Sequence, residues 1–243
     1  MDQMEHIKQE SILEFGSETT QKRYTKIASF GLWNSERILI EKYFRPKSKI
    51  LDIGCGSGRT TIPLYKRGFD VIGVDITPEM INTVKKISSE KQLNIVYKLG
   101  DATQLTYPNN YFEGAIFANN GWAQIPGERN RQKALNEIFR VLKSDGYLIL
   151  TAHQRYYSGS YLFFWIKQWT KFYILRPFGR KIEEIDFGDL FFDRPYSKAR
   201  QFIHLTHHKE VEKQIKNAGF TLETRESMAN ISNEDAREME GSL

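Results

Sequence analysis

The feature that most constrains this chain is a short apolar run at residues 50–53, followed by glycine at every second position in Gly54, Gly56 and Gly58. The pattern is typical of a buried strand that ends in a loop and continues into a helix. Glycine in such a loop lets the backbone adopt positive φ and lets a ligand approach main-chain atoms without meeting a Cβ. We therefore expect a ligand at the end of this strand, with a plain chain reversal as the alternative.

The sequence around this loop indicates the fold class. Between residues 49 and 152, short β-branched runs alternate with helix-periodic stretches. This alternation is typical of βαβ units, so we predict an α/β fold with a mostly parallel sheet. The expected strands are residues 49–53, 70–75, 94–98, 114–118 and 147–151.

Local start and stop signals place several helices. Thr77 as N-cap and Pro78 at the first helical position begin one helix, and a turn at 144–146 ends another. Gly219 closes a third helix, after which residues 220–225 are predicted to form a strand. The first 45 residues are expected to be a helical cap over the sheet.

Two acids narrow the ligand class. A strand, glycine loop and helix bind either dinucleotides, through their pyrophosphate, or S-adenosylmethionine, which carries no phosphate. Arg59 stands where the dinucleotide fingerprint requires a small residue. Asp75 ends the second strand, where a carboxylate accepts ribose hydroxyls in either class. Asp101 follows the third strand, beside the expected adenine position, and this second acid favours S-adenosylmethionine.

With these segments the chain resembles the class I S-adenosylmethionine-dependent methyltransferases, over about residues 49–151 and more weakly over 211–225. ILDIGCGSGR looks like the family's first motif, VIGVDIT its ribose-binding strand end, LGDATQL its adenine-side motif and EIFRVLKSDGYLIL the entry to its fifth strand. The resemblance implies a Rossmann-like doubly wound sheet, S-adenosylmethionine as cofactor and S-adenosylhomocysteine as product. Within the family, the chain is similar to the small-molecule branch, which includes ubiquinone-pathway and natural-product methyltransferases.

The resemblance also implies roles for individual residues. Gly54, Gly56 and Gly58 would flank the methionine part of the cofactor, and Asp52 would support their loop. The remaining cofactor contacts would be Cys55 in the loop, Asp75 at the ribose, Ile76 and Met80 on the adenine, Asp101 and Ala102 at the adenine edge, Asn119 at the methionine end, and Tyr24 and Trp33 closing the other side, unless these two pack in the core.

One departure from the family concerns the end of the sheet. The family ends with a strand hairpin, whereas no convincing final strand follows residues 220–225. Either residues 201–206 (QFIHLT) supply pairing in an unusual way, or the edge of the sheet is incomplete in this chain.

The acceptor side is harder to assign, because in-line transfer from a sulfonium needs alignment and no nucleophilic side chain. His153 is the best-placed general base, and the alternative is a histidine that satisfies a loop hydrogen bond. Tyr156 and Tyr157 are expected to line the acceptor pocket with Asn120 and Trp122, and plain packing is the alternative for Trp122.

Absent residues exclude several chemistries. Cytosine carbon-5 methylation needs a cysteine nucleophile, and the single cysteine, Cys55, belongs to the loop. Arsenic-type methylation needs several thiols. Amino-group methylation of adenine or glutamine uses Asn/Asp-Pro-Pro-aromatic, where this chain has residues 118–122 (ANNGW), so a nucleic-acid partner is not favoured. His207 and His208 are adjacent and lack a carboxylate at ligand spacing, so no metal is expected.

Aromatic residues concentrate in one segment. Of the 32 Phe, Trp and Tyr residues, 14 lie between Tyr156 and Tyr196, and residues 151–200 carry +4 (9 basic minus 5 acidic) of the net +5. Residues 161–173 are expected to be helical. Three interpretations stay open: a lid over an apolar or aromatic acceptor with an anionic group, a membrane-surface helix, or a partner interface such as a dimer seam.

Length and composition indicate one domain. The 243 residues, 40% of them hydrophobic, are divided into a helical cap (1–48), a cofactor core (49–152), an insertion (153–205) and a C-terminal part (206–243). A single cysteine and no signal-like start predict a cytoplasmic protein. The predicted function is methyl transfer to an O, N or C atom of a small molecule. The alternatives are a nicotinamide oxidoreductase and a non-catalytic module that binds a protein or membrane through 156–196.

Overall fold

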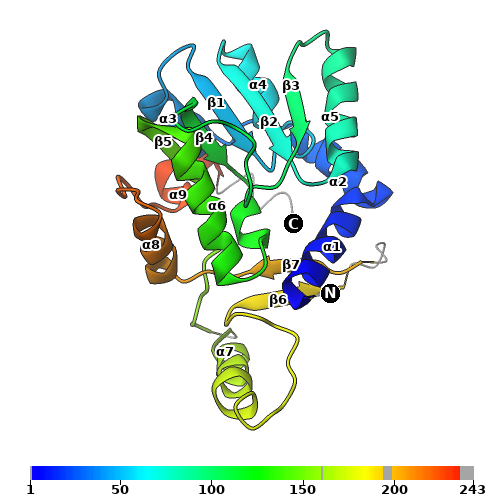
Figure 1. The fold of residues 1–243 in the computed structure, drawn as a ribbon, viewed down its shortest axis with the longest axis vertical. Coiled ribbons are helices and arrows are strands. Elements are labelled where there is room, and N and C mark those ends of the chain that lie inside the picture. The colour runs from blue at the N-terminus through cyan, green and yellow to red at the C-terminus, as the bar shows by residue number, and fades with distance from the viewer. Residues whose placement is uncertain (1, 160, 194–198, 236–243) are drawn as a thin grey trace.

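The computed structural model describes residues 2–159, 161–193 and 199–235, so the predictions that involve Ser160, residues 194–198 and residues 236–243 lie outside the described residues. Five strands form a parallel sheet in the order β3-β2-β1-β4-β5, with helices on both faces (Figure 1). The strands are β1 (Lys49–Ile53), β2 (Asp70–Asp75), β3 (Val96–Leu99), β4 (Phe112–Phe117) and β5 (Leu142–Leu150).

The predicted α/β, doubly wound sheet is confirmed, and its strands are buried on both faces. In β1, Leu51 packs in one hydrophobic cluster and the neighbouring Ile50 packs in the cluster on the opposite face. Such two-sided burial explains the continuous apolar run, which is typical of parallel sheets. The bounds predicted for β1 and β2 are those observed, and those of the other strands differ by a few residues.

Helices α4 (Thr61–Lys66), α5 (Pro78–Glu90) and α6 (Glu128–Val141) connect the strands, with a short helix η1 (Gly121–Gln124) after β4. The predicted start of α5 at Pro78 is confirmed. The turn predicted at 144–146 is wrong, because β5 begins directly after α6. Phe112 pairs with Leu142 and Gly114 with Tyr147, so the turn-forming residues form an irregularity within the strand pairing.

The predicted N-terminal helical cap consists of α1 (Gln3–Gly16), α2 (Glu18–Ala28) and α3 (Asn34–Tyr43). Helices α1 and α2 lie beside α5, near the carboxyl ends of the strands (Figure 1). Ser17 caps α2 by accepting a hydrogen bond from the backbone N–H of Thr20. The cap therefore covers the edge of the sheet where a ligand is expected.

The insertion after β5 forms two structures. Helix α7 (Tyr161–Thr170) continues into a π-helical turn, η2 (Lys171–Leu175), and then β6 (Asp189–Phe192) pairs antiparallel with β7 (Gln201–His204). The QFIHLT segment thus pairs in a separate two-stranded sheet. Strand β7 contacts α1 and η1 below the parallel sheet, whereas α7 projects beyond β6 and β7, away from that sheet (Figure 1).

The C-terminal part contains α8 (His208–Asn217) and the short α9 (Met228–Ile231). The strand predicted at 220–225 is wrong, because these residues pair with no strand among those described, although Phe220 packs on Phe139. Asp235 is buried and accepts hydrogen bonds from the backbone N–H groups of Asn34 and Ser35, so the tail caps α3. None of the described helices combines the length and the apolar character that a bilayer crossing requires.

Candidate active site

The glycine loop (residues 54–58) follows the carboxyl end of β1, and its glycines adopt the positive φ that the sequence predicts. Gly54, Gly56 and Gly58 have φ of 64°, 50° and 87°. A Cβ on Gly58 would lie 2.7 Å from Cγ2 of Val84, so this glycine is required for close packing against α5 as well as for its φ. The backbone of Gly54 and Gly56, which carry no side chains, lines an adjoining cavity.

That cavity lies at the carboxyl ends of β1 and β4 and has a volume of about 40 Å³. This is room for about one water molecule. Tyr24 of α2 covers it, with a ring carbon 4.0 Å from the position of a Cβ on Gly56. The residues that line it are Tyr24, Ile27, Gly54, Cys55, Gly56, Ser57, Arg59, Thr60, Ala118 and Asn119.

Asp52 lies beneath the loop and is completely enclosed. One of its carboxylate oxygens accepts hydrogen bonds from the hydroxyl groups of Thr60 and Thr61, which join the loop to α4. Burial raises the pKa of Asp52 to about 6 despite these hydrogen bonds. These contacts are those of a residue that supports the loop.

Asp75 ends β2 and turns its carboxylate toward the glycine loop. Its two oxygens accept hydrogen bonds of 2.9 Å from the backbone N–H groups of Gly56 and Thr77. Burial raises the pKa of Asp75, against the effect of these backbone donors. Met80 is buried beside the loop, 3.7 Å from the hydroxyl of Ser57, and Ile76 is half-buried.

Asp101 follows β3, as predicted, and it is held by α1. Its carboxylate accepts a hydrogen bond from the N–H of Thr103 and lies 2.8 Å from Nζ of Lys8. Burial would raise the pKa of Asp101, but the hydrogen bonds and charge of Lys8 and the N–H of Thr103 outweigh it and lower that pKa. Ala102 packs against the hydrophobic core. The sequence did not indicate Lys8.

Asn119 and Asn120 follow β4 in left-handed conformations, with φ of 51° and 58°. Asn119 lines the cavity, and the N–H of Asn120 donates to the hydroxyl of Thr151 at the end of β5. Trp122 is fully buried in the core, where its indole N–H donates to the carbonyl of Arg131. The structure therefore places Trp122 in packing rather than at the cavity.

The sequence also did not indicate the contacts of Arg59. Its guanidinium makes two hydrogen bonds, of 2.6 and 2.7 Å, to the buried carboxylate of Glu36 in α3. It also donates to the carbonyl of Gly31 and stacks on the ring of Trp33 at 5.6 Å. The glycine loop is thereby tied to the cap. Trp33 packs against this pair, whereas Tyr24 faces the cavity.

The three acceptor-side predictions in the insertion lie elsewhere. His153 is exposed, its backbone carbonyl binds Thr206, and desolvation of its ring lowers its pKa. The carbonyl of Tyr156 accepts a hydrogen bond from the indole of Trp165 in α7, and Tyr157 packs on the same indole. The cavity at the glycine loop is not lined by any of the three.

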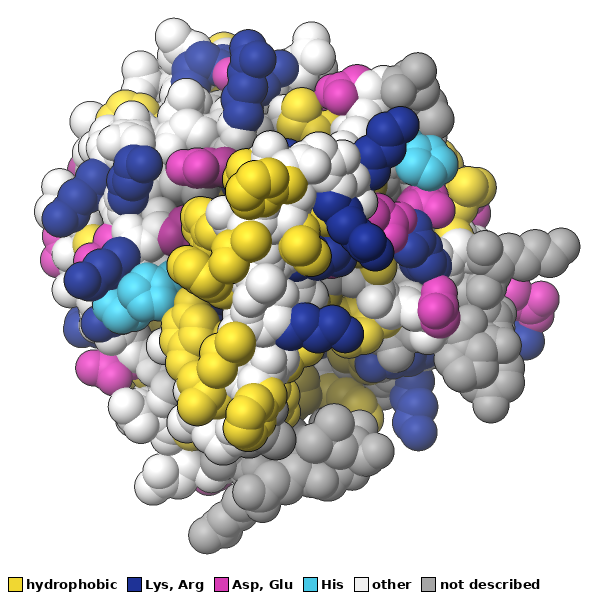
Figure 2. All heavy atoms as spheres, turned by 90° about the horizontal axis from the view of Figure 1, so that it is seen from below, with side chains coloured by type: hydrophobic (Ala, Val, Ile, Leu, Met, Phe, Trp, Pro, Cys, Tyr) yellow, Lys and Arg dark blue, Asp and Glu magenta, His cyan; other side chains and the backbone are white. Residues whose placement is uncertain are grey.

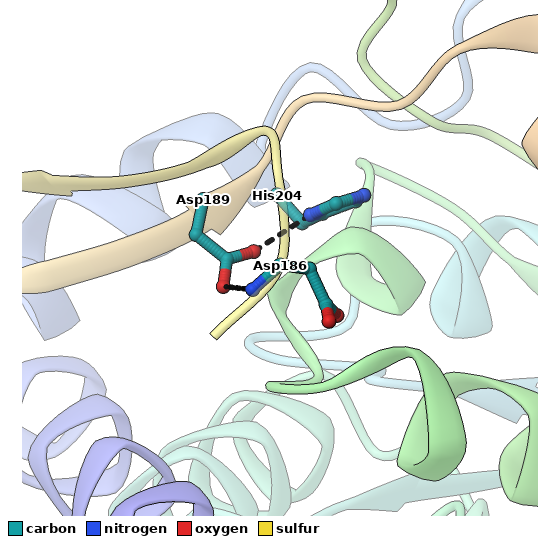
Figure 3. A group of neighbouring side chains, drawn as sticks. All are labelled: Asp186, Asp189 and His204. Atoms are coloured by element: carbon teal, nitrogen blue, oxygen red, sulfur yellow. Dashed lines mark hydrogen bonds and ion pairs between the residues drawn. The ribbon is translucent and has the colours of Figure 1, made fainter. Parts of the chain in front are cut away.

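A second polar group, which the sequence did not predict, joins the small sheet to α8. His204 of β7 is buried between Asp189 and Glu210, with 2.6 Å from each ring nitrogen to a carboxylate oxygen. Figure 3 shows the Asp189 carboxylate between the His204 ring and the backbone of Asp186. The Asp186 carboxylate binds Arg131 at 2.8 Å. Asp186, Asp189 and His204 are residue types that bind metals, and their potential ligand atoms lie within 4.8 Å of one another. Other protein groups already bind these atoms.

Comparison with known proteins agrees with this arrangement. Residues 50–146 match the family model described as a methyltransferase domain. The chain covers 92% of an S-adenosylmethionine-dependent methyltransferase structure from Methanosarcina mazei, which covers 80% of this chain, with 25% identity and a TM-score of 0.64. Residues 50–146 therefore form a methyltransferase domain, and the chain shares the fold of S-adenosylmethionine-dependent methyltransferases.

Two curated relatives align with this methyltransferase domain. A demethylmenaquinone methyltransferase of Symbiobacterium thermophilum is 31% identical over 155 residues, which are 60% of each chain. An eEF1A lysine and N-terminal methyltransferase of Mus musculus is 27% identical over 154 residues, which are 58% of this chain and 22% of the relative. The chain thus spans at most 60% of the length of these relatives.

The described residues of the methyltransferase domain fit S-adenosylmethionine. The glycine loop presents its backbone to the cavity, and carboxylates follow β2 and β3 on the same edge of the sheet. In this structure, backbone N–H groups bind the carboxylate of Asp75, and Lys8 binds that of Asp101. Cofactor binding would therefore exchange protein partners of these acids for ribose and adenine groups.

Proposed function

We propose that this protein transfers the methyl group of S-adenosylmethionine to a small organic acceptor. The observation that carries the proposal is the convergence of the glycine loop, Asp75, Asp101 and Asn119 at the carboxyl edge of one parallel sheet. Ligands of open α/β sheets bind at this edge. The backbone of Gly54 and Gly56 lines the cavity there.

Each polar group of this edge has a proposed task. Asp75 would bind the ribose hydroxyls and Asp101 the adenine side, while the backbone near Asn119 holds the methionine end. When bound, the cofactor supplies a methyl group on a positively charged sulfur. The protein then needs to align an acceptor atom with that methyl, and such positioning contributes about 7–11 kcal/mol in favourable cases.

The N-terminal cap would have to move for the cofactor to enter. The cavity of about 40 Å³ is far smaller than a nucleoside, and Tyr24 of α2 covers it. The Lys8–Asp101 ion pair joins α1 to the end of β3 at the same edge of the sheet. The ion pair is partly exposed, so breaking it costs little, on the order of 1 kcal/mol. We therefore propose that α1 and α2 open and close over the cofactor.

A small acceptor is favoured over a protein by what surrounds the strand ends. Strand β7 contacts both α1 and η1 below the sheet (Figure 1). A small molecule can be enclosed there, whereas a folded protein substrate would need this edge to be open. The name of the Symbiobacterium relative points to demethylmenaquinone, a small molecule, and that of the mouse relative points to a protein. We infer the former class, an apolar or aromatic molecule methylated at O, N or C.

His153 stays our proposed general base. Desolvation lowers the pKa of its imidazole, which favours the neutral form that can accept a proton from an O–H or N–H acceptor. The residue as a whole is exposed and does not line the cavity, so the acceptor or the insertion would have to enclose it. The buried, unpaired Cys55 is consistent with a reducing compartment, and we propose the cytoplasm.

Calorimetric titration with S-adenosylmethionine and S-adenosylhomocysteine tests cofactor binding. We expect saturable binding to the wild type and at least a tenfold loss in Asp75→Ala. The control is Glu90→Ala, which changes an exposed acid at the end of α5. Unchanged binding in Asp75→Ala would contradict the proposed site.

The acceptor class is tested with cofactor that carries a radiolabelled methyl group. The wild type is incubated with a cell extract that has been divided into a solvent-soluble small-molecule fraction and a protein fraction. We expect label in the small-molecule fraction, and its loss in Asp75→Ala. Label in precipitated protein would show a protein acceptor instead.

A further inference from the structure

The segment of residues 161–182, which we call the aromatic arm, contains α7 and η2 and leaves most of its large apolar side chains exposed. Phe163 and Phe178 are 78% and 87% exposed, and Trp169 is 51% exposed. Leu162, Ile166 and Trp169 follow each other at helical spacing and form one stripe. Figure 2 shows apolar side chains gathered along this face, with basic side chains beside them. Exposed patches of this kind mark interaction sites.

The arm is fixed to the protein by a separate set of side chains. Trp165 and Phe172 are buried, and both pack on Phe187, which lies outside the arm. The guanidinium of Arg155 stacks on Trp165, and Lys171 binds the carboxylate of Glu184. The exposed stripe is therefore not needed for anchoring. It is a surface that a fixed helix presents to its surroundings.

Charge distinguishes among partners for this surface. The arm contains Lys167, Lys171, Arg176, Arg180 and Lys181 and no acidic residue. Among the described residues, Lys167, Arg180 and Lys181 form no ion pair, and all three are exposed. A twofold contact between two copies of the arm would bring these like charges together. An anionic surface with an apolar interior complements both features.

We propose that the aromatic arm docks on the surface of a bilayer that contains anionic lipids. Leu162, Ile166 and Trp169 would enter the boundary between headgroups and acyl chains, and Tyr161 and Tyr173 would place their rings there with the hydroxyls in water. Lys167, Arg180 and Lys181 would face the lipid phosphates. The proposal concerns a face of the insertion and is independent of the proposed cofactor site.

Trp169 makes the proposal directly measurable. The other three tryptophans are buried or half-buried, namely Trp33, Trp122 and Trp165. We expect the full chain to sediment with vesicles of 70% phosphatidylcholine and 30% phosphatidylglycerol, and about tenfold less with phosphatidylcholine alone. Lipids brominated on their acyl chains should quench the emission of the wild type, and Trp169→Phe should lose most of this quenching.

Two variants test the two components of the surface. Ile166→Ser with Trp169→Ser should reduce vesicle binding at least tenfold, because both apolar side chains are lost. Lys167→Glu with Arg180→Glu should reduce it at least tenfold at low salt, since each basic residue near such a surface contributes roughly fivefold. The matched control is Lys85→Glu with Lys86→Glu, two exposed lysines of α5. This control should bind like the wild type.

Three results would overturn the proposal. The first is equal binding to both kinds of vesicle, and the second is binding without quenching of Trp169. The third is sedimentation of the free protein as a dimer that Ile166→Ser with Trp169→Ser dissociates, since the arm would then join two copies. Cofactor titration of the same variants should match the wild type, so a failure of cofactor binding is separable from a failure of membrane binding.

Discussion

Helices α5 and α7 contain similar apolar stripes and meet different surroundings. In α5, Met80, Ile81 and Val84 are buried against the sheet. In α7, Trp165 is buried while Ile166 and its neighbours in the stripe remain exposed. Helical spacing of apolar residues thus indicates a face that prefers to leave water, but it does not say what covers that face.

The sharpest test of this comparison changes one isoleucine in each helix to alanine. Ile81 is 4% exposed and Ile166 is 51% exposed. We expect Ile81→Ala to lower the free energy of unfolding by about 2–5 kcal/mol, because it leaves a cavity beside the sheet. Ile166→Ala should change it by less than about 0.5 kcal/mol. Urea titration measures both, and equal losses would mean that the stripe of α7 is packed.

Two acids, Asp52 in the core and Glu210 of α8, should contribute to the pH dependence of stability with opposite signs. The folded-state pKa of Asp52 is raised to about 6, so its contribution to stability falls as pH rises from about 4 to 6. As pH rises through this range, the free energy of unfolding of Asp52→Asn should therefore increase by up to about 3 kcal/mol relative to that of the wild type.

Glu210 behaves in the opposite way. Burial alone would raise its pKa, but the hydrogen bond to His204 and the charges of His204, Arg155 and Arg131 outweigh burial and lower it. Its stabilising contribution is present above pH 4.5 and is lost as pH falls through its lowered pKa. The loss caused by Glu210→Gln should therefore shrink in acid. Urea titrations of both variants at several pH values would show whether the two slopes differ in sign.

Two glycines with nearly equal φ separate backbone strain from packing. Gly58 in the glycine loop has a φ of 87°, and Gly179 in the aromatic arm has a φ of 85°. Alanine is strained at both, by about 1–2 kcal/mol. Only at Gly58 would the Cβ meet a neighbour below 3.0 Å, since nothing lies within 4 Å at Gly179. Thermal and urea unfolding should show that Gly58→Ala lowers the free energy of unfolding by about 1–3 kcal/mol more than Gly179→Ala does.

The smallest expected difference concerns two lysine–carboxylate pairs. Lys171 binds Glu184, whose side chain is 9% exposed, and Lys8 binds Asp101, whose side chain is 26% exposed. Lys171→Gln leaves a buried carboxylate without its cation and should cost about 1–3 kcal/mol. Lys8→Gln should cost no more than about 1 kcal/mol. Because Lys8→Gln also frees Asp101, calorimetry should show unchanged or tighter cofactor binding, and weaker binding would contradict the closing role of α1.

The sequence predicted well those parts in which local pattern and final contacts agree. Strands β1 and β2, the start of α5 and the positive φ of the three loop glycines follow from short-range spacing. Residues 220–225 had the strand pattern, but they pair with no strand in the described part of the chain. Residues 144–146 had a turn pattern, but pairing with β4 kept them within β5.

The sequence by itself determined the parallel sheet, the glycine loop and the order of the acids around it, because each depends on a periodicity or a spacing along the chain. Tertiary structure alone decided which distant groups meet: Arg59 with Glu36, Lys8 with Asp101, and Asp235 with the start of α3. It also decided that the aromatic arm projects away from the sheet. Charge pairing and exposure depend on the whole packed chain, and a local pattern does not contain them.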